Sequence, residues 1–218
     1  MIKLIIFDMD GLMIDSEPFH CMAYGEVLRQ FGKQLSLEYN NKHYVGKGDM
    51  FAGQDIVKRL SLPISAEELN SRKQAVYKKL IASEIIPQEG LVELLKKLHK
   101  NNYRKAVASG STLDEIRIII DGLNISKYIE SYFSAQQVKN GKPAPDLFLL
   151  TANEMGVDPS ECLVLEDAPS GVAAAKAAGM KCFVVPSRET KQEDFSNATL
   201  VLNSLTEVFD NIEKYISL

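Results

Sequence analysis

Five short apolar runs, spread along a chain of 218 residues, constrain the fold more than any other feature of this sequence. Within each run the apolar residues are continuous and do not alternate with polar ones, which is typical of strands covered on both faces of a parallel sheet. A sixth run reads as an edge strand. The predicted strands span residues 3–7, 105–109, 132–136, 162–166, 182–186 and 198–202.

Segments with helical periodicity separate these runs from residue 88 onward. The segment 111–123 opens with Thr112 and Glu115 at the spacing of a capping box, and the segment 204–216 opens with Ser204 and Glu207 at the same spacing. Strands that alternate with helices indicate a parallel sheet between helical layers. We therefore predict an α/β fold with a Rossmann-like parallel sheet core and helices on both faces.

Residues 16–86 interrupt this alternation. Segments 16–32 and 65–83 have helical patterns, a glycine-rich turn at 45–49 leads into a third helix, and no strand pattern is evident. This organisation predicts a helical cap domain inserted after the first strand. We expect an α/β core domain at residues 1–15 and 87–218, and a cap domain at residues 16–86.

The net charge and the cysteines limit the kinds of partner and the cellular compartment that we expect for this protein. The net charge is −4, without a long basic or acidic block, so neither nucleic acid nor a membrane is an expected partner. The three cysteines form no C-x-x-C pair and lie among apolar neighbours, which favours buried, reduced thiols and a cytoplasmic protein. The first apolar run ends at Asp8, too early for a signal peptide. We expect a monomer whose partner is a small molecule.

Polar side chains stand where each of the first four predicted strands ends. Ligands bind outside the carboxyl ends of the strands in an open parallel sheet, so these positions are candidates for one site. Two acids spaced by one residue follow the first strand, a serine-rich turn follows the second, a lysine follows the third and an acid pair follows the fourth. The candidates are Asp8, Asp10, Ser109, Gly110, Lys142, Glu166 and Asp167.

The chemistry that needs this set is phosphoryl transfer through an aspartyl phosphate. One carboxylate attacks phosphorus, and a second acid donates a proton to the leaving oxygen. A lysine, a hydroxyl and backbone N–H groups hold the charged phosphoryl oxygens. Mg²⁺ prefers oxygen ligands from a few carboxylates. Residues two apart on an extended chain project to the same side, so Asp8 would face phosphorus and Asp10 the leaving group.

Each of these residues also has a purely structural interpretation. Asp8 and Asp10 would suit a solvated turn, Ser109 a helix cap and Lys142 a loop, and the acid pair Glu166–Asp167 would suit the start of the following helix. An EF-hand is excluded because a third acid before the glycine is missing. The recurrence of such residues at successive strand ends favours the catalytic interpretation.

Four motifs together resemble the haloacid dehalogenase superfamily. They read DMDGLMIDSE, VASGS, GKPAPDLF and LEDAPSGVAAAKAAGM, and they occur in the order and at the spacing of that superfamily. The resemblance covers essentially the whole chain. It is strongest to the branch with a helical cap after the first motif, which contains β-phosphoglucomutase and pseudouridine-5′-phosphatase.

The resemblance implies a role for each matching residue. Asp8 matches the nucleophile, and Asp10 matches the general acid and base, whose backbone carbonyl binds the metal. Ser109 and Gly110 match the turn that binds the phosphoryl group, and Lys142 matches the lysine that neutralises nucleophile and phosphate. The implied Mg²⁺ ligands are Asp8, Asp10 and Asp167, with Glu166 either as a further ligand or as a residue that supports the ligands from outside.

The function we expect is a Mg²⁺-dependent phosphatase acting on a small phosphorylated metabolite, such as a sugar phosphate or a nucleotide-like compound. A β-phosphoglucomutase-type phosphomutase is the alternative. A phospho-accepting protein without catalytic activity and a dehalogenase are weaker alternatives, since the helical insertion argues against the first and Asp10 against the second.

Cap residues distinguish phosphatase from mutase. His20, Lys47 and Lys73 are candidate substrate ligands, with packed or solvated side chains as the simpler interpretation. In the mutase family the cap turn carries an arginine a few residues after its glycine. Here that turn reads VGKGD, so the arginine is absent and Asp49 lies nearby. This departure favours the phosphatase.

Overall fold

A computed structural model describes residues 1–44 and 48–216 of the chain. The chain divides into two compact units, which we call the core unit and the cap unit. The core unit comprises Met1–Asp15 and Ile86–Leu218, and the cap unit comprises Ser16–Ile85. Ile86 therefore belongs with the core, one residue from the expected boundary.

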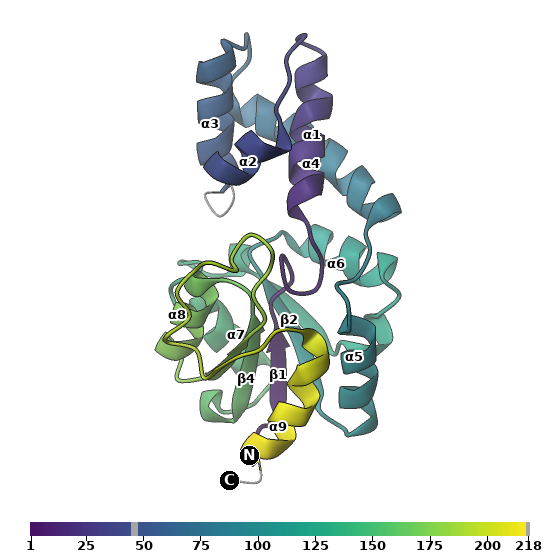
Figure 1. Cartoon of the computed structure of the whole chain (residues 1–218), viewed down its shortest axis with the longest axis vertical. Coiled ribbons are helices and arrows are strands. Elements are labelled where there is room, and N and C mark those ends of the chain that lie inside the picture. Colours follow the sequence, from purple (N-terminus) through teal and green to yellow (C-terminus); the bar gives the residue numbers. More distant parts are fainter. Residues whose placement is uncertain (45–47, 217–218) are drawn as a thin grey trace. The chain divides into compact units, whose positions relative to one another are not determined.

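The core unit is built on one sheet of six parallel strands in the order β3-β2-β1-β4-β5-β6 (Figure 1). The predicted sheet is confirmed. The first strand lies between the second and the fourth, so the residues that follow these three strands are neighbours at one edge. The bounds are β1 (Leu4–Phe7), β2 (Arg104–Ser109), β3 (Ser131–Ser134), β4 (Cys162–Glu166), β5 (Lys181–Val184) and β6 (Leu200–Val201).

The third strand ends two residues earlier than its apolar pattern predicts. The hydroxyl of Ser134 accepts a hydrogen bond from the backbone N–H of Gln136 at 3.1 Å, and a short 3-10 helix, η2 (Ala135–Gln137), follows. A serine side chain that bonds the backbone two residues ahead competes with the strand ladder. At this early end of β3, the Ser134 hydroxyl reaches the loop that follows β2 and donates to the carbonyl of Ser111.

Helices cover both faces of the sheet. On one face α7 and α8 pack together against the strands, and α5 and α9 pack together on the other (Figure 1). Nearly all apolar residues of the strands are buried, as expected for a sheet between two helical layers. The core helices are α5 (Leu91–Lys100), α6 (Leu113–Gly122), α7 (Asp146–Glu154), α8 (Pro169–Ala177) and α9 (Val208–Ile216), with 3-10 turns η1 (Ser126–Tyr128), η3 (Pro159–Glu161) and η4 (Leu205–Glu207).

Of the two predicted capping boxes in the core, one is confirmed. The Thr112 hydroxyl accepts from the Glu115 N–H at 3.3 Å, and the Glu115 carboxylate accepts from the Thr112 N–H at 2.8 Å. The box at Ser204 and Glu207 is wrong. Glu207 instead accepts from the backbone N–H of Asn203 at 3.3 Å, and the chain enters α9 through the 3-10 turn η4.

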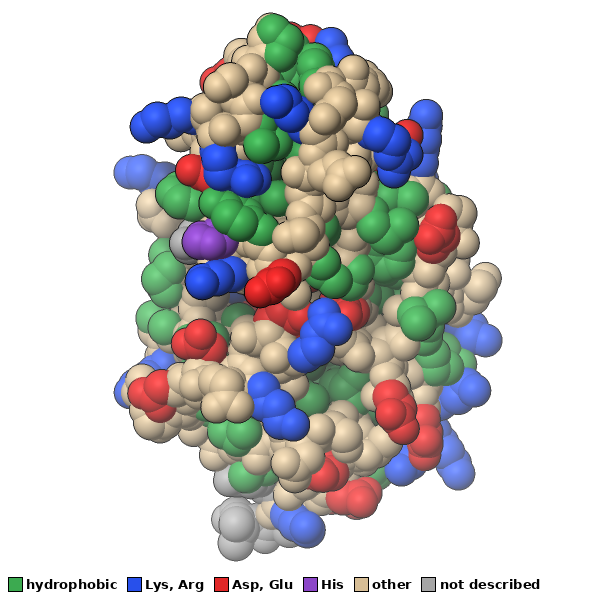
Figure 2. Space-filling view, turned by 45° about the horizontal axis from the view of Figure 1, so that its top comes forward, with side chains coloured by type: hydrophobic (Ala, Val, Ile, Leu, Met, Phe, Trp, Pro, Cys, Tyr) green, Lys and Arg blue, Asp and Glu red, His purple; other side chains and the backbone are tan. Residues whose placement is uncertain are grey.

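The face of the molecule shown in Figure 2 does not suggest a polyanionic partner. Lys and Arg side chains lie among Asp and Glu side chains over the face shown in Figure 2, without an extended basic area. In the part of the chain that the structure describes, no helix has both the length and the apolar character needed to cross a membrane.

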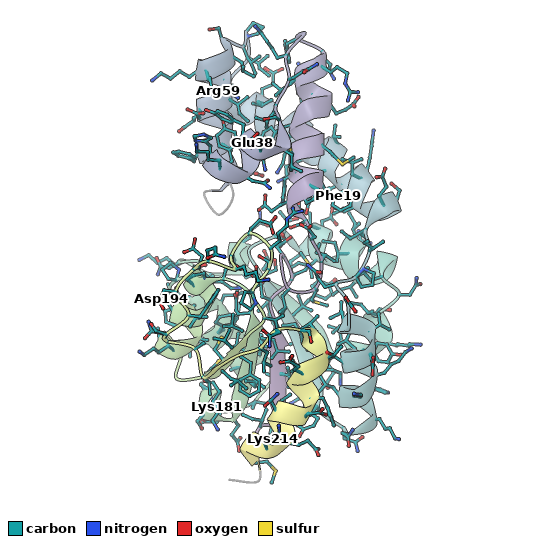
Figure 3. The ribbon with its side chains drawn as sticks, viewed as in Figure 1. Phe19, Glu38, Arg59, Lys181, Asp194 and Lys214 are labelled. Atoms are coloured by element: carbon teal, nitrogen blue, oxygen red, sulfur yellow. The ribbon has the colours of Figure 1, made fainter. Side chains whose placement is uncertain are left out.

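Within residues 16–44 and 48–85, the cap unit has four helices: α1 (Glu17–Arg29), α2 (Leu37–His43), α3 (Asp49–Leu60) and α4 (Ala66–Glu84). The long helix α4 packs against both α1 and α3. The sequence pattern missed α2, which is short and polar. Its start is capped by the hydroxyl of Ser36, which accepts from the Tyr39 N–H at 3.2 Å, and the Arg59 guanidinium lies 4.0 Å over the Tyr39 ring. Figure 3 labels Arg59 on α3 and Glu38 on α2.

A charged cluster lies inside the cap unit. Lys73 has a side-chain exposure of 0%, and its ammonium lies 2.7 Å from Oδ1 of Asp49. The rings of Tyr24 and Tyr77 lie 5.3 and 5.2 Å from the same ammonium. Asn70 accepts from the Tyr24 hydroxyl at 2.9 Å and donates to the Asp49 carbonyl at 2.9 Å. The lysine is therefore neutralised within the cap.

We expect Lys73→Met to destabilise the cap unit. The change keeps the volume of the side chain but leaves Asp49 without its counter-ion. Breaking a fully buried pair costs roughly 3–5 kcal/mol, and because Asp49 is partly exposed we expect about 1–3 kcal/mol. Urea unfolding followed by circular dichroism measures the loss.

The matched control is Arg72→Met, the neighbouring residue on α4. Its ion pair with Glu68 is solvent-exposed, and such pairs contribute at most about 1 kcal/mol. Equal free energies of unfolding for the two variants would show that the buried pair has no special importance.

Candidate active site

The turn after β1 carries the two aspartates to the carboxyl edge of the sheet. The backbone N–H of Asp8 still bonds the carbonyl of Leu165 in β4 at 2.9 Å, and the N–H of Gly11 closes the turn on the carbonyl of Ile14 at 2.8 Å. Gly11 has φ of +90°, a conformation that other residues rarely adopt. The chain therefore leaves the sheet sharply after Asp10.

Lys142 joins the ends of the first and fourth strands. Its ammonium lies 2.5 Å from Oδ1 of Asp8 and 2.6 Å from Oε1 of Glu166, and its side chain is only 13% exposed. Such short, charge-assisted contacts in a buried site are strong. The structure thus brings Asp8, Lys142 and Glu166 into contact, as their positions at the strand ends predict.

The backbone between β4 and α8 orients Glu166, the last residue of β4. Oε2 of Glu166 accepts from the backbone N–H groups of Asp167 and Ala168 at 2.9 and 3.0 Å. The hydroxyl of Thr190 donates to the Asp167 carbonyl at 2.6 Å. Both oxygens of Glu166 are therefore held, one by the helix start and one by Lys142.

Burial and crowding shift the pKa values of this cluster. Burial raises the pKa of Asp8 well above its usual value, the Lys142 ammonium lowers it, and Glu166, Asp167 and Asp10 raise it further. Burial, and next the charge of Glu166, raise the pKa of Asp167 to about 7. The pKa of Lys142 is raised because the attraction of Asp8 and Glu166 exceeds the effect of burial. The cluster holds more negative charge than Lys142 neutralises.

These residues suit a divalent cation. Asp8, Glu166 and Asp167 each offer a carboxylate oxygen, and the three atoms lie within 4.8 Å of one another. All three residues are buried, and their combined charge is only partly balanced. A hard cation with oxygen ligands, such as Mg²⁺, would relieve that excess.

The carboxyl groups of Glu166 and Asp167 occupy space that is free only because Gly171 and Gly11 have no side chain. A Cβ added at Gly171, in the first turn of α8, would overlap the carboxyl group of Glu166. A Cβ at Gly11 would overlap the carboxyl group of Asp167. A larger residue at either position would displace an acid of the cluster.

Two serines at the end of β2, Ser109 in the strand and Ser111 in the loop after it, bind Asp10. The hydroxyls of Ser109 and Ser111 donate to Oδ2 of Asp10 at 3.1 and 2.9 Å. The Ser109 hydroxyl also accepts from the Ser111 N–H at 3.0 Å. The hydroxyl of Ser134 donates to the Ser111 carbonyl at 2.6 Å. The ends of β1, β2 and β3 are thus linked through side chains.

The other sequence candidates have different surroundings. Gly110 is exposed in the loop after β2. In the cap unit, the ring of His20 stacks on that of Tyr77 at 4.1 Å, and Lys73 is buried against Asp49. Lys47 lies outside the described residues. Substrate binding by these cap residues stays a prediction.

Sequence reasoning missed three residues of the site. Ser111 stands beside the candidate Ser109, so the serine pair in the SGS turn was the available signal. Gly171 lies in the first turn of α8, where the local helical structure does not require a glycine, and that was the available signal. Ser134 carried no signal, because it stands 23 residues from its partner Ser111.

Comparison with known proteins confirms the resemblance drawn from the four motifs. A family model described as haloacid dehalogenase-like hydrolase matches residues 2–179. The protein named "Probable pseudouridine-5'-phosphatase" of Drosophila melanogaster is 34% identical over 208 residues, covering 93% of this chain and 89% of its own. The fructose-1-phosphate phosphatase YqaB of Escherichia coli is 34% identical over 179 residues, covering 81% and 92%.

A solved structure shows the same fold. The β-phosphoglucomutase of Clostridium difficile superposes with a TM-score of 0.78 at 25% identity, covering 100% of both chains. Phosphatases and a mutase therefore stand among the relatives.

We expect Gly171→Ala to weaken Mg²⁺ binding. Alanine normally stabilises a helix interior over glycine, but here its methyl group would push the Glu166 carboxyl away from Lys142 and the acids. Displacing a group that orients metal ligands typically costs roughly 10–100-fold in affinity, and we expect a loss of that size. Calorimetric titration with Mg²⁺ measures it.

The control is Gly25→Ala in α1, where an added Cβ meets no atom within 4 Å. An unchanged Mg²⁺ affinity in the folded Gly171→Ala protein would exclude Glu166 from the metal site.

We expect Mg²⁺ to stabilise the protein more at neutral than at acidic pH. The pKa of Asp167 is about 7 in the folded protein against 3.8 for the ordinary carboxyl. The folded state therefore binds a proton that the unfolded chain has lost, and the stability of the metal-free protein falls as pH rises through this window. Mg²⁺ needs the ionised carboxyl and must displace that proton below pH 7.

The melting temperature, measured with and without Mg²⁺, should rise more at about pH 7.5 than at about pH 5.5. Asp167→Asn should reduce the difference, and what remains should come from Asp8, whose pKa is also raised. Equal shifts at both values would contradict the assignment of Asp167 as a ligand.

Proposed function

Because the chain belongs to the haloacid dehalogenase-like hydrolases and its named relatives include phosphatases, we propose that it is a Mg²⁺-dependent phosphatase of a small phosphomonoester. The observation that carries the proposal is the contact of Lys142 with both Asp8 and Glu166, beside Asp167. A nucleophilic carboxylate, a fixed ammonium and a cluster of acids are the parts that phosphoryl transfer needs.

The first half-reaction forms an aspartyl phosphate. A carboxylate oxygen of Asp8 attacks phosphorus, and the bond from phosphorus to the ester oxygen breaks. Asp10 gives its proton to that leaving oxygen, so the product departs as a neutral alcohol. Lys142 lowers the pKa of Asp8 against the effect of burial and so favours its ionised form. It also neutralises the phosphoryl oxygens, while Ser109 and the Gly110 N–H donate to them.

The second half-reaction hydrolyses this acyl phosphate. A water molecule attacks phosphorus, and the bond between phosphorus and the Asp8 oxygen breaks. Asp10, now ionised, takes the proton from the attacking water. Inorganic phosphate leaves, and both aspartates return to their starting protonation states.

Mg²⁺ would be held by the carboxylates of Asp8, Glu166 and Asp167 and by the Asp10 carbonyl. When bound, it supplies positive charge that offsets the nucleophile and the phosphoryl oxygens. The crowding of acids that raises the pKa of Asp167 supports this assignment.

We propose a small, hydroxylated phosphate ester as the substrate. The two named phosphatase relatives carry a nucleoside phosphate and a sugar phosphate in their names. Both compounds are polyhydroxylated monophosphates of similar size. Within that class the substrate depends on the cap unit, whose loops tolerate change.

The second candidate is a phosphomutase, favoured by the structural likeness to β-phosphoglucomutase. A mutase must retain a bisphosphate and therefore needs a cation for its second phosphate. In the described part of the cap, Lys73 is already paired with Asp49 at 2.7 Å. The cap turn also lacks the arginine of the mutase family. Both observations support the phosphatase.

A phosphate-release screen over sugar phosphates and nucleoside monophosphates tests the proposal. We expect release with Mg²⁺ and none after chelation. Asp8→Asn should show no detectable turnover, because the amide cannot replace the nucleophile. The control Asp121→Asn, on the exposed end of α6, should keep wild-type activity.

The same experiment separates the two candidates. β-Glucose 1-phosphate, primed with glucose 1,6-bisphosphate, should release phosphate or remain unchanged in the phosphatase. Rapid conversion to glucose 6-phosphate, with much slower phosphate release, would identify a mutase. Turnover in Asp8→Asn equal to wild type would refute the aspartyl-phosphate mechanism.

A further inference from the structure

Asp10 is held by two hydroxyl groups on the same oxygen. Ser111 and Ser109 both donate to Oδ2, at 2.9 and 3.1 Å. Oδ1 is buried, and among the described residues it has no hydrogen-bond partner. One side of the carboxyl group is therefore anchored, and the other is available to exchange a proton.

The number of protons that each hydroxyl can donate gives Ser109 and Ser111 different roles. A hydroxyl has one proton to donate. The proposed function assigns the proton of Ser109 to a phosphoryl oxygen, so Ser109 cannot donate to Asp10 when substrate is bound. Only the Ser111 hydroxyl would then remain on Oδ2.

The backbone of Ser111 is itself fixed. Its carbonyl accepts from the buried Ser134 hydroxyl at 2.6 Å, and its N–H donates to the Ser109 hydroxyl at 3.0 Å. The next residue, Thr112, begins the capping box of α6. A hydroxyl on so constrained a backbone can orient its partner with little loss of entropy.

We propose that Ser111 is the positioning residue for Asp10: its hydroxyl holds Oδ2 through both half-reactions, while Ser109 turns to the phosphoryl group. This inference rests on the proposed function. Ser111 acts through Asp10 and breaks no bond itself. Its loss should therefore impair proton delivery to the leaving oxygen and leave the phosphoryl-binding groups in place.

The test compares two esters that differ in their need for a proton. An alkyl phosphate leaves as a basic alkoxide and requires protonation, whereas nitrophenyl phosphate leaves as a stable phenolate. The alkyl ester is the one that wild type hydrolyses fastest. Asp10→Asn supplies the benchmark, since losing a general acid costs roughly 10²–10⁴-fold and should affect the alkyl ester more.

We expect Ser111→Ala to lower kcat for the alkyl ester by roughly 10–100-fold, the cost of a displaced catalytic group. The loss for the nitrophenyl ester should be several times smaller, and KM should change little for either. Ser111→Thr keeps the hydroxyl and should restore most of the alkyl activity. Ser109→Ala should impair both esters alike, and Ser126→Ala, an exposed serine of η1, should impair neither.

Equal losses on both esters in Ser111→Ala, or a higher KM with unchanged kcat, would overturn the proposal and make Ser111 a structural or phosphate-binding residue. If Ser111→Ala does not fold, Ser111→Cys takes its place, because the thiol is similar in size but a weak donor. A wild-type protein that hydrolyses neither ester refutes the proposed function, and with it this inference.

Discussion

The structure depends above all on the balance of charge around Lys142. One ammonium contacts the carboxylates of Asp8 and Glu166, with Asp167 close by, in a site that is largely shielded from water. Three like charges so close repel strongly in a low dielectric. The parallel sheet makes the arrangement possible, because β1 lies beside β4 and their ends meet at one edge. The same imbalance prepares the site for a divalent cation.

Lys73 of the cap unit is also shielded from water, and comparing it with Lys142 explains what each lysine can do. The carboxylates around Lys142 carry more negative charge than its ammonium neutralises, so a further cation would be stabilised there. Lys73 lies between two tyrosine rings and one carboxylate, which balances its charge within the cap unit. In the proposed function the contacts of Lys142 serve chemistry, whereas the Lys73–Asp49 pair is expected to stabilise the cap.

Small residues determine how precisely the acids are placed. Gly171 and Gly11 leave space for the carboxyl groups of Glu166 and Asp167, and Ser111 binds Asp10. None of the three residues supplies the charge of the site. They decide instead whether charged groups stand where phosphoryl transfer needs them.

The sequence alone predicted the α/β class, the strand segments and a helical insertion, because continuous apolar runs and helical periodicity reflect burial directly. It missed α2, which is short and polar, and it placed the end of β3 two residues too late. It also identified Asp8, Asp10, Ser109, Lys142, Glu166 and Asp167, since polar residues after buried strands must meet at one edge. Only the tertiary structure showed that Ser111 and Ser134 support Asp10, that Gly171 makes room for Glu166, and that Asp49 neutralises Lys73. These contacts join side chains from different elements, and their geometry depends on packing that no local pattern encodes.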